Sequence, residues 1–261
     1  MLPRNEVLAW RSVAPWAAEN DVEQDLIITR AVFDIFEDPW LAERLAFRGG
    51  TALHRLYLAP PARYSEDIDL VQRIPEGIGP TFDRLREQLG WVGKPRPDIE
   101  RQPKMTFQFE AGTGTASPAK RKIKVEINTT EHFGLVVPVE YRVDHEVLTR
   151  SCEIPSYSLE ELLGTKVRAL YQRKKGRDLF DLWWAMTHRD LDLDHVAANF
   201  RRYMGAEGSE TPSAAQFRRN LDAKAMAGAF DEVRPLLRTD VAYDPAEALA
   251  WFEESFLPLL E

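Results

Sequence analysis

One stretch of this chain combines a glycine turn with two alternating carboxylates. Gly49-Gly50-Thr51 opens a short helical run, and Asp67-Ile68-Asp69-Leu70 follows it. In a strand over 67–71, Asp67 and Asp69 would project from one face, about 6.6 Å apart along the chain, while Ile68 and Leu70 face a core. Two carboxylates beside a turn where backbone N–H groups can approach a phosphate indicate a site for a divalent metal and a triphosphate.

Asp67 and Asp69 have a simpler reading as solvated groups on an exposed strand edge. Asp is disfavoured in strands, however, and like charges on one face repel each other unless a cation lies between them. We therefore expect these two residues to chelate Mg²⁺. One ion, or two ions about 4 Å apart, would bridge the phosphates of a nucleotide.

The Gly49-Gly50-Thr51 turn is a weak signal by itself, because Gly-Gly is common in turns. Its place between a strand and a helix makes it more informative, since the free N–H groups of the new helix and the Thr51 hydroxyl could hold a phosphate. The sequence lacks the Gly-Lys-Ser/Thr ending of a P-loop and lacks a dinucleotide-binding fingerprint. Phosphorylation of the nearby Ser65 would place negative charge beside the metal site and repel a triphosphate.

A third carboxylate, Glu126, falls on the polar face of an alternating strand over 121–128. The apolar face of that strand carries Ile123, Val125 and Ile127. Glu126 could complete a two-metal site from a neighbouring strand. It could equally pair with a basic neighbour in a surface charge ladder, in which the candidate partners are Arg121, Lys122 and Lys124. The sequence leaves both readings open.

The second half of the chain carries a basic run, Arg173-Lys174-Lys175-Gly176-Arg177-Asp178, between two helical patterns. Asp178 and Asp181 lie one turn apart on an otherwise apolar helix, so they need cationic partners, for which Lys166, Arg168 and Arg177 are the candidates. We favour a functional cluster that binds a triphosphate or RNA, with Asp178 orienting Lys166 or a nucleophile. A solvated charged face and a snorkelling Lys166 are the alternatives.

Composition excludes several classes of protein. The 261 residues carry a net charge of −8, which argues against a protein that coats DNA or RNA through an excess of Lys and Arg. The single Cys152 excludes an internal disulfide framework and a Cys-based zinc site. No apolar run approaches the length of a membrane span, and the first residues lack a signal-peptide pattern, so we expect a cytoplasmic protein with no membrane contact.

Hydrophobic periodicity predicts an α+β fold, with a mixed sheet and helices up to about residue 155 and a helical lobe after it. The long helix of the first half is expected to have Asp21 as its N-cap, and residues 91–104 are expected to be irregular. The expected elements are helices at 22–37, 39–44, 49–57 and 80–90, strands at 45–47 and 67–71, a hairpin of 105–111 with 121–128 around 112–115, and one strand at 139–143 or 146–149. Helices follow from a capping box at Ser158 to the end of the chain.

Taken in order, these motifs resemble the AbiEii/AbiGii (MenT-like) nucleotidyltransferase toxin family. The resemblance rests on four segments between about residues 45 and 184: Gly-Gly-Thr-Ala-Leu, Tyr-Ser-Glu-Asp-Ile-Asp-Leu, Lys-Val-Glu-Ile-Asn, and the run from Glu161-Leu162-Leu163-Gly164-Thr165-Lys166 to Asp181-Leu182. It implies a polymerase-β-like nucleotidyltransferase domain, 1–155, a helical lobe, 156–261, and an active site in a cleft between them. It also implies a toxin of a bacterial toxin–antitoxin or phage-defence pair.

The resemblance assigns roles to individual residues. Gly49, Gly50 and Thr51 match the family's glycine turn, and Asp67 and Asp69 match its metal carboxylates. Glu126 matches the acid of the second motif. Lys166 matches the family's lysine, and Arg177 and Asp178 match its final Arg-Asp pair. It implies Mg²⁺ as cofactor, an NTP as substrate, an RNA acceptor such as a tRNA 3′ end, and a cognate antitoxin that need not bind stably; DNA is not expected as a partner.

Two other functions fit the same residues. In one, the enzyme keeps its site but transfers the nucleotide to a protein or to a small molecule. In the other, the chain is a non-catalytic module that binds a metal–nucleotide complex without turnover.

Overall fold

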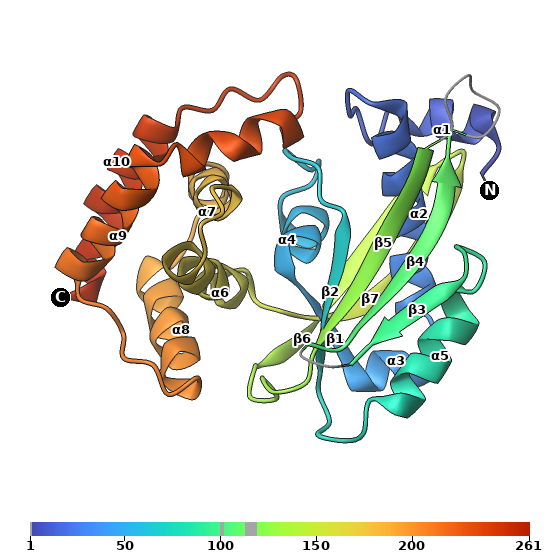
Figure 1. Cartoon of the computed structure of the whole chain (residues 1–261), viewed down its shortest axis with the longest axis horizontal. Coiled ribbons are helices and arrows are strands. Elements are labelled where there is room, and N and C mark those ends of the chain that lie inside the picture. Colours follow the sequence, from blue (N-terminus) through green and yellow to red (C-terminus); the bar gives the residue numbers. More distant parts are fainter. Residues whose placement is uncertain (1, 100–101, 113–118) are drawn as a thin grey trace. The chain divides into compact units, whose positions relative to one another are not determined.

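A computed structural model of the chain describes residues 2–99, 102–112 and 119–261. The chain divides into two compact units, Met1–Tyr157 and Ser158–Glu261. In Figure 1 the first unit runs from blue to yellow and contains all the strands, while the second runs from dark yellow to red and is helical. This architecture confirms the predicted α+β class.

Five strands form the main sheet of the first unit, in the order β1-β2-β5-β4-β3. β2 and β5 run parallel and the other neighbours run antiparallel, so the sheet is mixed as expected. The strands are β1 Leu45–Arg48, β2 Asp67–Gln72, β3 Pro95–Asp98, β4 Lys104–Ala111 and β5 Ala119–Asn128.

The hairpin of β4 and β5 is confirmed by its register, in which Ala111 pairs with Ala119 and Lys104 with Glu126. Most of the turn expected around 112–115 lies outside the described residues. The prediction that 91–104 is irregular was wrong, because β3 pairs with β4 there. Proline can occupy this strand because it lies at the sheet edge, where a missing N–H breaks no ladder bond.

A second, two-stranded sheet consists of β6, Val136–His145, and β7, Leu148–Tyr157. One short strand at 139–143 or 146–149 was expected, and both the number and the length of strands were wrong. β6 contains a single buried residue, Tyr141, but its sequence alternates from Val139 to Asp144, so the signal for a strand was present and its full length was missed.

The first unit also contains five helical segments: α1 Arg4–Trp10, α2 Glu19–Phe36, α3 Pro39–Arg44, α4 Gly49–Ala52, which continues as the π-helical turn η1 Leu53–Tyr57, and α5 Gly79–Leu89. The expected N-cap at Asp21 was wrong, since α2 begins two residues earlier, after Ala18. Asp21 lies in the first turn of α2 and pairs with Arg121 of β5.

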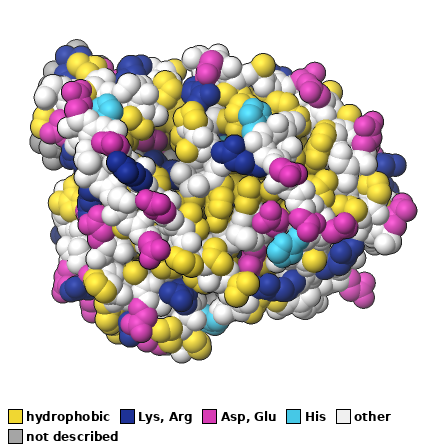
Figure 2. All heavy atoms as spheres, turned by 180° about the vertical axis from the view of Figure 1, so that it is seen from behind, with side chains coloured by type: hydrophobic (Ala, Val, Ile, Leu, Met, Phe, Trp, Pro, Cys, Tyr) yellow, Lys and Arg dark blue, Asp and Glu magenta, His cyan; other side chains and the backbone are white. Residues whose placement is uncertain are grey.

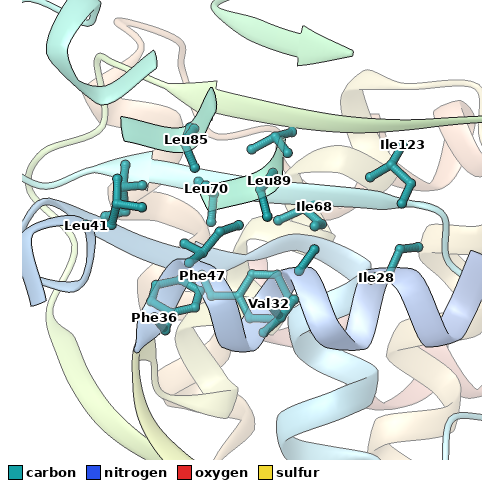
Figure 3. Close-up of a cluster of buried hydrophobic side chains, with 14 of the residues drawn as sticks. Ile28, Val32, Phe36, Leu41, Phe47, Ile68, Leu70, Leu85, Leu89 and Ile123 are labelled. Carbon is teal, nitrogen blue, oxygen red and sulfur yellow. The ribbon is translucent and has the colours of Figure 1, made fainter. Parts of the chain in front are cut away.

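The apolar face of the main sheet and the helices that cover it form one core. Ile68 and Leu70 of β2 point into this core, as predicted. α2 packs against β4 and β5, and Figure 3 shows side chains of α2, such as Ile28 and Val32, facing those of the strands. Because this face is apolar, the alternate residues of β2 and β5 are directed to the opposite face of the sheet.

The second unit is a bundle of helices built on a core rich in aromatic rings, among them Phe200, Phe217, Phe252 and Phe256. Ser158 caps its first helix by accepting a hydrogen bond from Glu161 N (3.2 Å). The segments are α6 Leu159–Gln172, α7 Arg177–His188, α8 Leu193–Ala206, α9 Ala214–Met226, η2 Ala229–Leu236, α10 Pro245–Ser255 and η3 Leu257–Leu260.

A buried ion pair anchors the N-terminal segment to the first unit. Asp25 of α2 accepts hydrogen bonds from the indole N–H groups of Trp10 (3.0 Å) and Trp16 (3.2 Å). Its Oδ2 also lies 3.0 Å from a guanidinium nitrogen of Arg55, which donates to Thr29 as well (2.6 Å). Asp25 and Arg55 are both buried, so each depends on the other for charge compensation.

We predict that Asp25→Asn lowers the free energy of unfolding by about 3–5 kcal/mol, because it leaves Arg55 buried without a counter-charge. Asp34→Asn on the same helix is the matched control. Asp34 pairs with Arg150 (2.7 Å) at a partly exposed site, so its loss should cost less than about 1 kcal/mol. Urea denaturation measures both values, and equal losses would contradict the prediction.

Candidate active site

The polar face of the main sheet carries a row of four charged residues, two acidic in the middle and a basic one at each end. Asp69 of β2 is paired in register with Arg48 of β1 on one side and with Glu126 of β5 on the other. Glu126 is paired in turn with Lys104 of β4. Residues paired in register project from the same face, so four strands contribute one charge each to this row.

The next row contains Asp67 and Lys124, which are partners in the parallel pair of β2 and β5. Lys124 Nζ lies 3.4 Å from Asp67 Oδ1 and 3.9 Å from Glu126 Oε1. We refer to Asp67, Asp69 and Glu126 as the carboxylate cluster. The structure therefore brings the three predicted acidic residues to one face, and it also forms part of the charge ladder that was the alternative for Glu126.

The carboxylate cluster is electrostatically strained. Partial burial raises the pKa of Glu126 above its ordinary value, and the negative charges of Asp69 and then Asp67 raise it further. Lys124 and Lys104 act in the opposite direction without cancelling the shift. A divalent cation among these carboxylates would relieve the repulsion that raises this pKa.

Gly49 lets the chain pass directly over Asp69. Its φ of 79° lies in the left-handed region that favours glycine. A Cβ at this position would also overlap Asp69 Oδ2. At Gly50 a Cβ would lie 2.5 Å from a guanidinium nitrogen of Arg63, which is buried beneath the turn. The two glycines are thus required by close approach of a carboxylate and of a cation.

Thr51 connects the glycine turn to β2. Its buried hydroxyl donates to the backbone oxygen of Asp67 (2.5 Å) and lies 2.8 Å from Ser65 Oγ. Because the single Thr51 proton is directed at Asp67, Ser65 must be the donor in the second bond. Thr51 therefore fixes the start of the strand that carries the cluster. The phosphate contact expected of Gly49, Gly50 and Thr51 stays a prediction, as does modification of Ser65.

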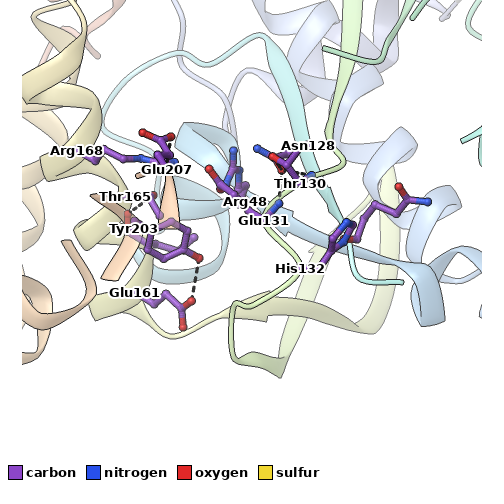
Figure 4. Close-up of polar contacts among 12 residues, drawn as sticks. Arg48, Asn128, Thr130, Glu131, His132, Glu161, Thr165, Arg168, Tyr203 and Glu207 are labelled. Carbon is purple, nitrogen blue, oxygen red and sulfur yellow. Dashed lines mark hydrogen bonds and ion pairs between the residues drawn. The ribbon is translucent and has the colours of Figure 1, made fainter. Parts of the chain in front are cut away.

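Arg48 flanks the cluster from β1 and forms an ion pair with Glu131 in the turn after β5. Figure 4 shows this pair beside Asn128, whose Oδ1 accepts from the backbone N–H groups of Thr130 (2.9 Å) and Glu131 (2.8 Å). Burial lowers the pKa of Arg48, but Glu131 and then Asp69 hold it above its ordinary value. The turn after β5 thus positions a permanent cation next to Asp69.

In the second unit, Lys166 of α6 joins both acidic residues of α7. Its Nζ lies 2.9 Å from Asp178 Oδ1 and 2.8 Å from Asp181 Oδ2. The lysine side chain is 11% exposed and the aspartates 3% and 0%. Lys166 is therefore the partner that the apolar context of Asp178 and Asp181 required, and the reading of Lys166 as a snorkelling side chain was wrong.

The other candidate partners in the second unit have different contacts. Arg168 pairs with Glu207 (2.6 Å), and Figure 4 shows this pair near the hydrogen bond from Tyr203 to Glu161 (2.9 Å). Arg177 is the first residue of α7. Among the described residues Asp178 Oδ2 is buried with no hydrogen-bond partner, so this oxygen can still accept a bond.

A buried lysine of α9 holds the end of α6. Lys224 Nζ donates to the backbone oxygens of Leu170 and Tyr171, the latter at 3.0 Å. Burial lowers the pKa of Lys224 to about 8, and Asp178 opposes this shift. A cation at the C-terminal carbonyls of a helix is stabilising, so Lys224 fixes the helix on which Lys166 lies.

The chemistry of the carboxylate cluster fits a hard divalent cation, because carboxylate oxygens are the ligands that Mg²⁺ prefers. Within the described ranges, no three or more His, Cys, Asp or Glu side chains stand in positions that could hold a metal ion. The argument for a metal ion therefore rests on the carboxylate oxygens of the cluster and on the repulsion that raises the pKa of Glu126. Lys124 is the cation that lies at the cluster.

Sequence reasoning missed three groups around the carboxylate cluster, Arg48, Arg63 and Lys104, and one group of the second unit, Lys224, which holds α6. Arg48 and Lys224 do not stand out in the sequence, since their partners, Glu131 and the end of α6, lie far along the chain. The alternation of β5 did place Lys124 on the same face as Glu126, so that signal was present and was assigned only to a charge ladder.

A family model described as "Nucleotidyl transferase AbiEii toxin, Type IV TA system" matches residues 30–252. That range contains every predicted site residue. No curated protein matches the chain. A separate search of the described helices finds none that is long and apolar enough to cross a membrane.

Two solved structures share the fold. MenT4, a nucleotidyltransferase toxin from Mycobacterium tuberculosis H37Rv, superimposes with a TM-score of 0.58 at 14% identity, covering 100% of both chains. JHP933 from Helicobacter pylori gives a TM-score of 0.54 at 16% identity, covering 93% of this chain and 94% of its own. At these identities the likeness concerns the fold, and it agrees with the nucleotidyltransferase fold expected from the motifs.

We predict that Gly49→Ala lowers the free energy of unfolding by about 2 kcal/mol or more, since Ala is strained at this φ and its methyl group displaces Asp69. Gly77→Ala is the control, because a Cβ at Gly77 meets no atom within 4 Å and its φ is outside the left-handed region. Its effect should stay within about 0.5 kcal/mol. Thermal or urea unfolding measures the difference, which vanishes if the close approach to Asp69 is unimportant.

We predict that Lys166→Met costs about 3–5 kcal/mol of stability, because two buried carboxylates lose their counter-ion. The triple variant Lys166→Met, Asp178→Asn, Asp181→Asn removes the charges together and should recover at least half of that loss. Equilibrium denaturation distinguishes the two variants. A triple variant as unstable as the single one would show that charge pairing is not the cause.

Proposed function

The chain belongs to the AbiEii nucleotidyltransferase toxin family of type IV toxin–antitoxin systems, and from this membership we propose that it transfers a nucleotide from an NTP to RNA with the help of Mg²⁺. The family assigns it a nucleotide substrate and an antitoxin partner. The observation that carries the proposal is the carboxylate cluster on one face of β2 and β5, beside a glycine turn.

The carboxylate cluster would hold the metal, with Asp67 and Asp69 as ligands from alternate positions of one strand and Glu126 as a ligand from the next. With Mg²⁺ bound by these residues, the site would supply positive charge that offsets the charge developing on the phosphates of the nucleotide during transfer. Thr51 and Gly49 fix the position of the two aspartates, and Arg48 places a positive charge beside Asp69.

Lys166 is proposed to contact the triphosphate. An ammonium group has three donors, and Asp178 and Asp181 take two of them. The two aspartates fix the direction of the side chain, so Asp178 acts as a positioning residue for Lys166. Arg177, at the start of α7, supplies a second cation next to Asp178 in the sequence. Together these groups would orient the triphosphate for transfer.

RNA is the proposed acceptor, with the tRNA 3′ end as the expected site of transfer. On the face of the molecule in Figure 2, Lys and Arg side chains lie interspersed with Asp and Glu. This distribution and the net charge of −8 favour recognition of a restricted part of an RNA over general binding along its backbone. Transfer to a protein or small molecule remains the alternative, as does binding without turnover.

We predict that Asp69→Asn lowers nucleotide transfer from a labelled NTP to RNA at least about 100-fold, because the metal loses a carboxylate ligand. Asp98→Asn on β3 is the control. Asp98 pairs with Lys104 (2.8 Å) at a site that is 44% exposed, and its loss should leave transfer unchanged. Circular dichroism and the unfolding midpoint verify that both variants fold.

Each of the four NTPs is tested with total RNA, with purified protein and with small-molecule acceptors. Label in RNA that requires Mg²⁺ and Asp69 supports the proposal. Label in protein or in a small molecule instead would move the acceptor to another class. Nucleotide binding without any transfer would favour a non-catalytic module. Unchanged transfer by Asp69→Asn would overturn the assignment of the site.

A further inference from the structure

We propose that Lys124 is a built-in counter-ion of the carboxylate cluster, with which a divalent metal ion must compete for Asp67 and Glu126. The ammonium group lies between these two carboxylates, 3.4 Å from one and 3.9 Å from the other. The inference rests on the proposed metal site and adds to it a residue that sets how tightly the metal binds.

The register of the sheet dictates this position. Lys124 is the direct partner of Asp67 across the parallel pair of β2 and β5, and Glu126 follows two residues later on the same face of β5. Both acidic groups are therefore immediate neighbours of one lysine. A lysine in this register therefore lies within reach of both carboxylates.

Arg48 and Lys104, the two cations in the row of Asp69 and Glu126, have ion-pair partners outside the cluster. Arg48 forms its ion pair with Glu131, and Lys104 forms its ion pair with Asp98. Both ion pairs found for Lys124 among the described residues go to members of the cluster. Lys124 is thus the cation that compensates Asp67 and Glu126 most directly.

The contacts of Lys124 are weak enough to be exchanged. Both distances exceed the usual length of a charge-assisted hydrogen bond, and the lysine side chain is 28% exposed. Lys166 offers a contrast inside the same chain, because it lies 2.9 Å and 2.8 Å from its two carboxylates and is only 11% exposed. Lys166 is held in place, whereas Lys124 can turn to solvent at little cost.

Lys124 brings one positive charge to the two carboxylates that it contacts, Asp67 and Glu126, so it leaves the cluster only partly neutralised. A dication carries twice the charge and can approach the carboxylate oxygens directly, so it has the stronger interaction and displaces the ammonium. The consequence for function is a site that is kept stable without metal and binds metal less tightly than the carboxylates alone would.

The test is direct binding of Mn²⁺, followed by the electron paramagnetic resonance signal of the free ion. We expect Lys124→Gln to lower the Kd for Mn²⁺ roughly tenfold, because a positive charge next to the ion is removed. Lys122→Gln is the matched control. Lys122 is exposed on the same face of the same strand, two residues away, and the Kd of this variant should equal that of the unmodified chain.

A second measurement does not depend on the resonance signal. A tenfold tighter site gives about 1.4 kcal/mol more stabilisation at saturating Mn²⁺. Without metal, Lys124→Gln should unfold at a lower temperature than the unmodified chain. Added Mn²⁺ should raise the unfolding temperature of the variant by more than that of the unmodified chain. Equal gains in the two proteins would overturn the proposal even if the variant is destabilised.

Asp67→Asn separates failure of this proposal from failure of the proposed function. If Asp67→Asn weakens Mn²⁺ binding while Lys124→Gln leaves the Kd unchanged or raises it, only the counter-ion role of Lys124 is wrong. If Asp67→Asn binds Mn²⁺ as tightly as the unmodified chain, the carboxylate cluster is not the metal site and both proposals fall.

Discussion

Repulsion among the carboxylates on one face of β2 and β5 is the constraint on which the rest of the site depends. Partial burial and then the negative charges of Asp69 and Asp67 raise the pKa of Glu126, and carboxylates this close together are tolerated only with cations nearby. The chain provides these cations in two ways. Arg48 lies at the flank with its own partner, Glu131, and Lys124 lies within the cluster. In the proposed function, a metal ion bound by the cluster would complete the compensation.

Backbone geometry turns this charged face into a defined site. Gly49 takes a left-handed conformation and allows Asp69 to pack against the turn without a Cβ between them. Thr51 fixes the start of β2 through Asp67 O, while Ile68 and Leu70 anchor the same strand in the core. Alternation along one strand thus separates the two tasks: every second side chain stabilises the sheet, and the others carry the charges. In the second unit, α7 divides the same two tasks among its residues. Its aspartates form ion pairs with Lys166, while its apolar residues are buried in the core.

The sequence was sufficient for features that depend on local pattern. Neighbouring residues alone were enough to predict the alternation of β2 and β5, the capping residue Ser158 and the glycine turn. What it could not supply were contacts between distant segments, such as Arg48 with Glu131 or Lys224 with the end of α6. It also failed where burial is incomplete. β6 and β7 bury few side chains, so only part of their length was predicted, and the two prolines of β3 suggested a loop although an edge strand accepts them.

The central claim is that the carboxylate cluster binds the catalytic metal, and crystals of the chain grown with Mn²⁺ and a non-hydrolysable NTP test it most directly. Anomalous scattering locates the manganese without reference to activity. The account predicts a peak coordinated by Asp67 and Asp69, with Lys124 Nζ withdrawn from Asp67. Manganese bound elsewhere, with the cluster still paired to Lys124, would contradict it.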